Sequence, residues 1–273
     1  MIEKEIKLAN ELEIAKALSV NAGKAIMEIY TSNSFDIANK EDNIYINANL
    51  KSSDIINNGL KNDFPNYGLL NEKTAGMTDR LNKDYVWIVD PLDGVKEFIS
   101  GNEEFTINIG LVYRGEPVLG VIYLPAKDIL FFATRGNGAF FENKGNMTKL
   151  STSNKFNVDE MIIIKNKYLS EEREDKLIKS NRFKEIKTAE SSFNGCSIAK
   201  GESDVYFKFG SVYEWNICAM NVILMEAKGE LTNLGGFRLK YNKENTLIED
   251  GFLASNGKIH NYLLALEEID QNG

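Results

Sequence analysis

Two aspartates three residues apart are the strongest candidates for chemistry in this sequence. They lie in Trp87-Ile-Val-Asp90-Pro-Leu-Asp93-Gly-Val-Lys-Glu-Phe98, directly after an apolar run that favours a β-strand. Pro91 has no N–H for a ladder bond, so the strand is expected to end there, and Asp93 with Gly94 resembles the cap of a helix. Such a turn brings both carboxylates together beside backbone N–H groups. That arrangement suits Mg²⁺, which takes few carboxylates and keeps waters or phosphate oxygens as its other ligands.

A surface turn is the competing interpretation, because Asp, Pro and Gly are common turn residues. The pattern Asp-x-x-Asp-Gly alone favours that interpretation, but the apolar strand before it and the helical pattern after it favour a metal site. The whole stretch resembles the first signature of the inositol monophosphatase superfamily of Mg²⁺-dependent, Li⁺-sensitive phosphatases. Residues 93–99 and 104–109 are similar to the bacterial 3'(2'),5'-bisphosphate nucleotidases, which act on 3'-phosphoadenosine 5'-phosphate.

The resemblance implies a metal site gathered from three places in the chain. Its expected ligands are Glu72, Asp90, the Leu92 carbonyl, Asp93 and Asn216. Asn216 follows Trp215 where the family has Asp, and an amide oxygen brings no negative charge. Glu72, Asp90 and Asp93 therefore supply three negative charges against the four positive charges of two Mg²⁺. We expect one well-occupied metal site and a second that fills only when substrate phosphate is present.

The groups that activate water in the family are also replaced. The family has Thr or Ser at Val95, and valine keeps the shape of threonine without its hydroxyl. An ungapped alignment places Leu50 where the family has the acidic partner of that hydroxyl, whereas a shift of a few residues would offer Asp54. Glu72 then remains as the candidate base. Losing a general base costs about 10²–10⁴ in rate.

The resemblance also implies a set of substrate contacts. These are Gly94, Val95, Lys96, Ser192 and Lys208. Glu190 and Asn194 stand where the nucleotidases resemble Gly and Lys, and both changes disfavour a bisphosphate. Val212 replaces a usual Thr.

Two hypotheses about function follow. In the first, the protein has a phosphatase fold, binds Mg²⁺ and a phosphorylated small molecule, and hydrolyses it slowly or not at all. In the second, it is an active Mg²⁺-dependent phosphatase acting on 3'-phosphoadenosine 5'-phosphate or on a sugar or inositol phosphate. A purely structural role has no sequence feature in its favour.

Composition excludes several other classes. The 273 residues carry a net charge of −8, which argues against a nonspecific nucleic-acid surface. No apolar run reaches the roughly 20 residues that span a bilayer, and no secretory signal is evident, so we expect a cytoplasmic protein without membrane contact. Cys196 and Cys218 are expected to be buried free thiols, and His260, the single histidine, is expected to open the last helix. A homodimer is compatible with the sequence.

The elements that position these residues follow from periodicity. We expect helices at 3–30, 51–60, 170–179 (with Ser170 as N-cap), 193–199, 214–228 and 258–269. Strands are expected at 67–71, 85–90, 106–113, 118–124, 129–134, 139–142, 161–165, 185–188, 205–209 and 252–254. Residues 39–49 are expected to form a loop or weak strand, and 73–83 a mobile polar segment. The fold class is α/β (α+β), and the resemblance implies a layered α-β-α-β-α sandwich, with an N-terminal lobe at 1–145 and a C-terminal lobe at 146–273.

Overall fold

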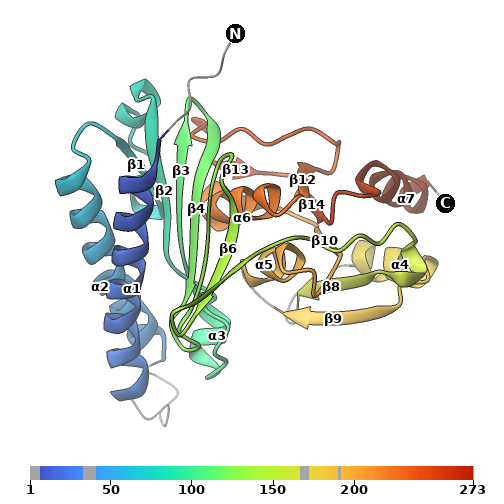
Figure 1. Cartoon of the computed structure of the whole chain (residues 1–273), viewed down its shortest axis with the longest axis horizontal. Helices are drawn as coiled ribbons and strands as arrows, with labels where there is room; N and C mark the ends of the chain where they lie inside the picture. The colour runs from blue at the N-terminus through green and yellow to red at the C-terminus, as the bar shows by residue number, and fades with distance from the viewer. Residues whose placement is uncertain (1–6, 33–40, 167–171, 190–191, 273) are drawn as a thin grey trace.

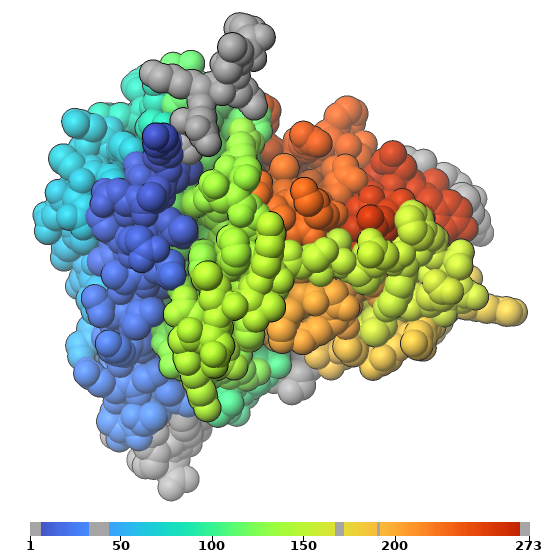
Figure 2. All heavy atoms as spheres, viewed as in Figure 1, coloured from blue at the N-terminus to red at the C-terminus, as the bar shows by residue number. Residues whose placement is uncertain are grey.

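The computed structural model describes residues 7–32, 41–166, 172–189 and 192–272. Its helices and strands form five alternating layers, which confirms the predicted α-β-α-β-α sandwich (Figure 1). Helices α1 and α2 cover one face of the first sheet, α5 and α6 lie between the two sheets, and α4 and α7 cover the far face of the second sheet. Figure 2 shows α1 and α2 (blue) and α7 (red) at opposite ends of the molecule.

Seven α-helices are described. They are α1 (Ala9–Ser32), α2 (Glu41–Asp63), α3 (Val95–Ile99), α4 (Glu172–Ser180), α5 (Phe193–Ala199), α6 (Glu214–Glu226) and α7 (His260–Asn272). Three short 3₁₀ helices are η1 (Glu72–Thr74), η2 (Asp79–Asn82) and η3 (Val158–Glu160). Helix α6 is buried almost all round, as expected for a helix between two sheets.

The first sheet has the strand order β1-β2-β3-β4-β5-β6-β7. Its strands are β1 (Gly68–Leu70), β2 (Tyr85–Asp93), β3 (Thr106–Tyr113), β4 (Glu116–Leu124), β5 (Ile129–Thr134), β6 (Gly138–Asn143) and β7 (Asn146–Lys149). From β2 onward each strand runs antiparallel to the next, as the meander predicted, while β1 pairs with β2 in parallel. Strand β7 continues this sheet past residue 145, and the lobe boundary stays a prediction.

The second sheet has the order β12-β14-β10-β8-β9, and β11 and β13 form a separate small sheet. The strands are β8 (Ile162–Asn166), β9 (Glu185–Ala189), β10 (Val205–Lys208), β11 (Val212–Tyr213), β12 (Glu230–Asn233), β13 (Leu247–Ile248) and β14 (Phe252–Ser255). Strands β7, β11, β12 and β13 were not expected, because they are two to four residues long and partly polar. Both cysteines are buried free thiols, as predicted.

Two sequence-based expectations were wrong near the site. Helix α2 begins at Glu41, so described residues 41–49 form two helical turns rather than a loop or weak strand. Buried Ile44 and Ala48 hold these turns against α1 and the first sheet, and this packing outweighs the low helix propensity of the asparagines around them. Strand β2 continues through Pro91 to Asp93, because the ladder with β3 is interrupted between Asp90 and Asp93 and needs no N–H from the proline.

Other differences are smaller. Residues 73–83 contain η1 and η2 rather than a structureless segment, and Arg80 is buried there. Residues 3–6 of the first expected helix, residues 39 and 40, Ser170 with its capping role, and Glu190 lie outside the described residues. Within the described ranges, every helix is too short or too polar to cross a bilayer.

Candidate active site

The irregular end of β2 places Asp90 and Asp93 at one edge of the first sheet. Asp90 pairs with Asn108 of β3 and Asp93 pairs with Thr106, with a register shift between the two pairs. Regular pairing would alternate the side chains between faces, and the shift turns the strand so that both carboxylates interact with each other. The sequence-predicted pair of aspartates is therefore close in space.

Asp90 is the buried member of the pair. Its side chain is 8% exposed, and it accepts hydrogen bonds from the Leu92 backbone N–H at 3.3 Å and the Asn216 side-chain amide at 2.8 Å. Burial raises the pKa of the Asp90 carboxyl well above its ordinary value, and the negative charges of Asp93 and Glu72 raise it further. The two hydrogen bonds oppose this rise only in part, so this carboxylate lies where a cation would stabilise it.

Asp93 is tied to the start of α5. Its Oδ2 accepts from the backbone N–H of Ser192 at 3.3 Å and from the Asn108 amide at 3.3 Å. The Ser192 hydroxyl lies 3.1 Å from Asp93 and 2.7 Å from the Asn216 carbonyl oxygen, and its one proton can be donated to either. Ser192, expected as a substrate contact, thus joins β2 to α5 and α6.

Glu72 approaches the same place from β1. It opens η1, which the Asn71 side chain caps through the Thr74 N–H. Glu72 is exposed, yet it shares with Asp90 a pocket of about 20 Å³, a space that suits roughly one water molecule. Asn49, Ser53 and Trp215 are among the other lining residues.

Two hydroxyl groups of helix α2 donate hydrogen bonds to the segment between Asp90 and Asp93. The Tyr45 hydroxyl donates to the Leu92 carbonyl at 2.8 Å, and the Ser52 hydroxyl donates to the Pro91 carbonyl at 2.6 Å. From this helix Asn49 and Ser53, one turn apart, line the small pocket. Leu50 is 41% exposed and Asp54 is also exposed, and neither is among the residues that line it.

The remaining predicted substrate contacts differ in accessibility. Gly94 is the N-cap of α3 with a φ of 95°, and a Cβ there would lie 3.1 Å from the Phe105 backbone. Val95 and Lys96 follow it and are exposed. Lys208 donates to the carbonyl of its neighbour Phe209, and no contact described in the structure joins it to the acidic residues.

Asn194 is fully buried, and its amide donates to Asn166 at 3.0 Å. This asparagine therefore joins α5 to the end of β8.

Asn216 is oriented by the helix it belongs to. Its Oδ1 accepts from the Tyr213 backbone N–H at 3.3 Å, which directs its NH₂ group toward Asp90. The oxygen that would ligate a metal therefore points at the helix N-terminus. In this orientation Asn216 donates a hydrogen bond to Asp90, and its expected role as a metal ligand stays a prediction.

The oxygen atoms at this site can hold Mg²⁺ with few protein ligands. Within the described ranges, no three Asp, Glu, His or Cys side chains form a ready-made metal cage, and no lysine or arginine forms an ion pair with Asp90. Mg²⁺ is commonly held by one or two carboxylates with waters and phosphate oxygens completing its shell. Asp90, Asp93 and the Leu92 carbonyl meet that requirement, with Glu72 at the edge.

Several residues of this site were not expected from the sequence. Asn108, Tyr45, Ser52 and Asn49 were not singled out. Asn108 gave a usable signal, because a polar residue in the apolar strand 106–113 needs a buried partner. The α2 residues gave a weaker one, since the helix was expected to begin only at residue 51.

Known proteins resemble this chain over most of its length. The model of the inositol monophosphatase family matches residues 7–271. The 3'(2'),5'-bisphosphate nucleotidase CysQ of Buchnera aphidicola is 33% identical over 247 residues, covering 87% of this chain and 91% of that protein. The protein of the same name from Escherichia coli K12 is 30% identical over 241 residues, covering 87% of this chain and 96% of its own.

Solved structures show the same fold. The crystal structure of CysQ from Bacteroides thetaiotaomicron superposes with a TM-score of 0.78 at 31% identity, covering 91% of this chain and 97% of that one. Inositol monophosphatase II of Staphylococcus aureus superposes with a TM-score of 0.80 at 25% identity, covering 94% and 95% of the two chains.

Proposed function

This chain belongs to the inositol monophosphatase family, and on that premise we propose that it binds Mg²⁺ and a phosphorylated small molecule at Asp90 and Asp93 but hydrolyses it slowly or not at all. The observation that carries this proposal is the 2.8 Å hydrogen bond from the Asn216 amide to Asp90. The resemblance predicts an aspartate at position 216. A neutral donor there occupies an oxygen of Asp90 that the metal would otherwise use.

Asp90, Asp93 and the Leu92 carbonyl are the groups that would hold the metal, with Glu72 approaching from β1. Bound Mg²⁺ supplies a lowered pKa for a coordinated water and neutralises charge on phosphate oxygens. The chain's own residues hold the aspartates in place: Ser192 and Asn108 through Asp93, and Tyr45 through Leu92. With three acidic groups and a neutral Asn216, we expect one ion to bind readily and a second to need the substrate phosphate.

Two carboxylates line the water-sized pocket, those of Glu72 and Asp90, and Asp90 is the proposed metal ligand. Val95 has no hydroxyl. Asn49 and Ser53 are the α2 residues on the pocket wall, and we assign the vacated acidic position to Asn49, which has the shape of aspartate, rather than to Leu50 or Asp54, which do not line the pocket. An amide does not take a proton from water near neutral pH. Glu72 remains as the proton acceptor, and the loss of a positioned base slows hydrolysis by about 10²–10⁴.

The proposed ligand class is 3'-phosphoadenosine 5'-phosphate and related phosphorylated molecules. Support comes from the relatives that are 30–33% identical, which are named as bisphosphate nucleotidases. The second candidate function is an active Mg²⁺-dependent phosphatase. One observation favours it: the exposed carboxylate of Glu72 lies beside the pocket that also contains Asp90.

Phosphate release separates the two functions. The protein is incubated with 3'-phosphoadenosine 5'-phosphate, an inositol monophosphate and a sugar phosphate, with Mg²⁺ and with or without Li⁺. Slow or undetectable release is expected, and fast Li⁺-sensitive release would establish the second candidate.

Two triple variants then test the cause. One carries Val95→Thr, Asn49→Asp and Asn216→Asp, and its matched control carries Leu50→Asp in place of Asn49→Asp. Because groups that act as a unit are strongly non-additive, the first variant should gain about 10²-fold or more in rate over any single change. The control should gain far less. Equal rates in the two variants would contradict the assignment of Asn49.

A further inference from the structure

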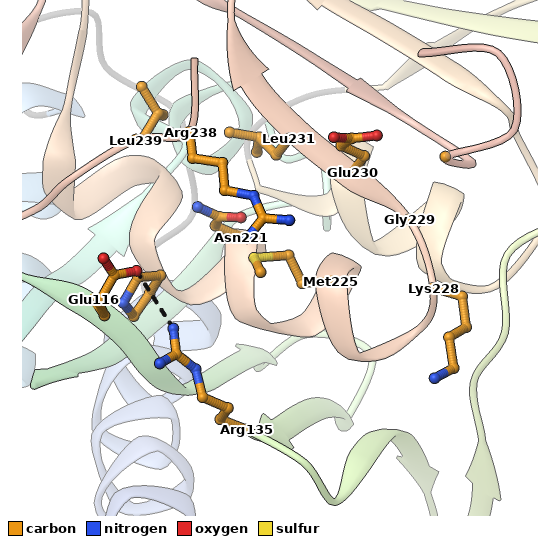
Figure 3. A pocket seen from close by; sticks show the side chains of 12 residues that line it. Glu116, Arg135, Asn221, Met225, Lys228, Gly229, Glu230, Leu231, Arg238 and Leu239 are labelled. Carbon is orange, nitrogen blue, oxygen red and sulfur yellow. Dashed lines mark hydrogen bonds and ion pairs between the residues drawn. The ribbon is translucent and has the colours of Figure 1, made fainter. Parts of the chain in front are cut away.

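A second pocket lies where the first sheet, α6 and β12 meet, and it shares no lining residue with the pocket at Asp90. Its volume is about 300 Å³, the lower end of the range for small-molecule sites. Figure 3 shows Asn221 and Met225 of α6 on one wall, with Arg238 extending toward them from the loop after β12. Glu116 and Arg135 approach from β4 and the end of β5.

Asn221 is a buried amide whose oxygen has no hydrogen-bond partner among the described residues. It is 2% exposed, and its NH₂ group donates to the Tyr241 hydroxyl at 2.8 Å, while its Oδ1 accepts no hydrogen bond from any described residue. Turning the amide over would pair the oxygen with Tyr241 and leave the NH₂ group short of an acceptor instead. A buried polar atom without a partner costs about 1–3 kcal/mol. In the orientation described, Asn221 therefore presents an acceptor that a hydrogen-bond donor in the pocket would satisfy.

The charges around Asn221 favour an anion. Arg135, Lys228 and Arg238 line the pocket, against the carboxylates of Glu116 and Glu230. Glu116 is already shared between Arg135, at 3.4 Å, and Lys240. Arg238 and Lys228 form no ion pair with any described residue. A local excess of positive charge in a chain of net charge −8 attracts small anions.

We propose that this pocket binds a small carboxylate or phosphate that also carries a hydroxyl or amino group. The guanidinium groups of Arg238 and Arg135 face the anion, and Oδ1 of Asn221 accepts from the hydroxyl or amine. Guanidinium groups match the planar geometry of carboxylate and phosphate oxygens. The site is separate from the proposed phosphatase chemistry, because Asn216 faces Asp90 whereas Asn221 and Met225, further along α6, face the second pocket.

Matched probes test both parts of the recognition. Glycerol 3-phosphate and propyl phosphate share a phosphate, and glycerate and propionate share a carboxylate, but only the first of each pair carries hydroxyl groups. Titrations are done in EDTA, so that no metal recruits phosphate to Asp90. The readout is the ¹³C-methyl signal of Met225, assigned with Met225→Leu, because this side chain lines the second pocket.

At least one hydroxylated probe should shift the Met225 signal and bind about tenfold more tightly than its partner without hydroxyls, the worth of one hydrogen bond. Arg238→Gln should weaken that binding about tenfold, whereas Arg182→Gln, an exposed arginine beyond α4, should leave it unchanged. The carboxylate and phosphate pairs show which anion is preferred.

Asn221→Leu should abolish the preference for hydroxylated probes. If this buried variant does not fold, Arg238→Gln and the probe pairs still decide the question. Three results would overturn the proposal: no shift of Met225 with any probe, equal binding within both pairs, or binding that Arg238→Gln leaves unchanged. Because no metal is present, failure here leaves the phosphatase proposal standing, and failure of phosphate release leaves this one standing.

Discussion

At the scale of single residues, Asn216 shows how one atom changes a site. Aspartate and asparagine have the same shape, so the fold accepts either at position 216. The amide presents a donor to Asp90 because its oxygen is held by the Tyr213 N–H. The identity of residue 216 was readable in the sequence, whereas the direction of its amide was not, because that direction depends on where α6 begins.

Asn216→Asp should therefore lower the stability of the metal-free protein and raise its affinity for Mg²⁺. In EDTA, a third carboxylate beside Asp90 and Asp93 lacks the hydrogen bond and adds repulsion, so we expect a loss of about 1–3 kcal/mol of unfolding free energy. With Mg²⁺ the added charge should tighten binding about tenfold or more. Thermal unfolding at increasing Mg²⁺ measures both effects.

Asn58→Asp is the matched control, since Asn58 is exposed on α2 and the substitution makes the same chemical change away from the aspartates. It should shift neither the stability in EDTA nor the Mg²⁺ dependence. An Asn216→Asp variant that behaved like this control would show that position 216 does not face the ion.

At the scale of elements, α2 is an example of a helix that the sequence predicted only in part. Buried positions recur every fourth residue along it: Ile44, Ala48, Ser52, Ile56 and Leu60. That stripe was present in the sequence, but intervening polar residues hid it, and the helix was expected only from residue 51. The same limit applies to Pro91, where only the ladder with β3 determines how far β2 runs. By contrast, long apolar alternation made β3, β4 and β5 predictable to within about two residues.

Ser52→Ala tests whether α2 holds the aspartate turn. The substitution removes the donor to the buried Pro91 carbonyl and should lower the unfolding free energy by about 1–3 kcal/mol. Asp54→Ala, on the exposed face of the same helix, should change it by less than about 0.5 kcal/mol. Urea unfolding of both variants gives the comparison, and a Ser52→Ala variant as stable as the parent would mean that water replaces the hydroxyl.

At the scale of the whole molecule, α6 joins the two sheets. It packs against β3 and β4 of the first sheet and against β12 of the second. The layered arrangement was expected from the family resemblance, and the alternation of strands and helices in the second half agreed with it. The contacts between layers were not predictable, because they join residues far apart in the chain. Asn108 with Ser192, and Arg80 with Asn242, are two such contacts.

His260 belongs to this scale because it fastens the last helix to the second sheet. It is 3% exposed, with Nε2 2.8 Å from the Thr232 hydroxyl of β12 and Nδ1 2.8 Å from the Ser255 hydroxyl of β14. Thr232 donates its own proton to the Asn233 carbonyl, so Nε2 carries the imidazole hydrogen and Nδ1 accepts from Ser255. Protonating Nδ1 would break that bond. Burial lowers the pKa of His260 from 6.5 to about 4.

Acid should therefore destabilise the fold through this one imidazole. Between pH 6.5 and 4 the unfolded chain binds a proton that the folded chain does not, so the unfolding free energy falls as pH falls, by about 3 kcal/mol at pH 4. His260→Gln cannot take up that proton, and its stability should vary less with pH across this window. Urea unfolding of both proteins from pH 4 to 7 isolates the difference, since His260 is the only histidine and the carboxylates are common to both. Parallel pH profiles would mean that the imidazole is already protonated, or reached by water, in the folded protein.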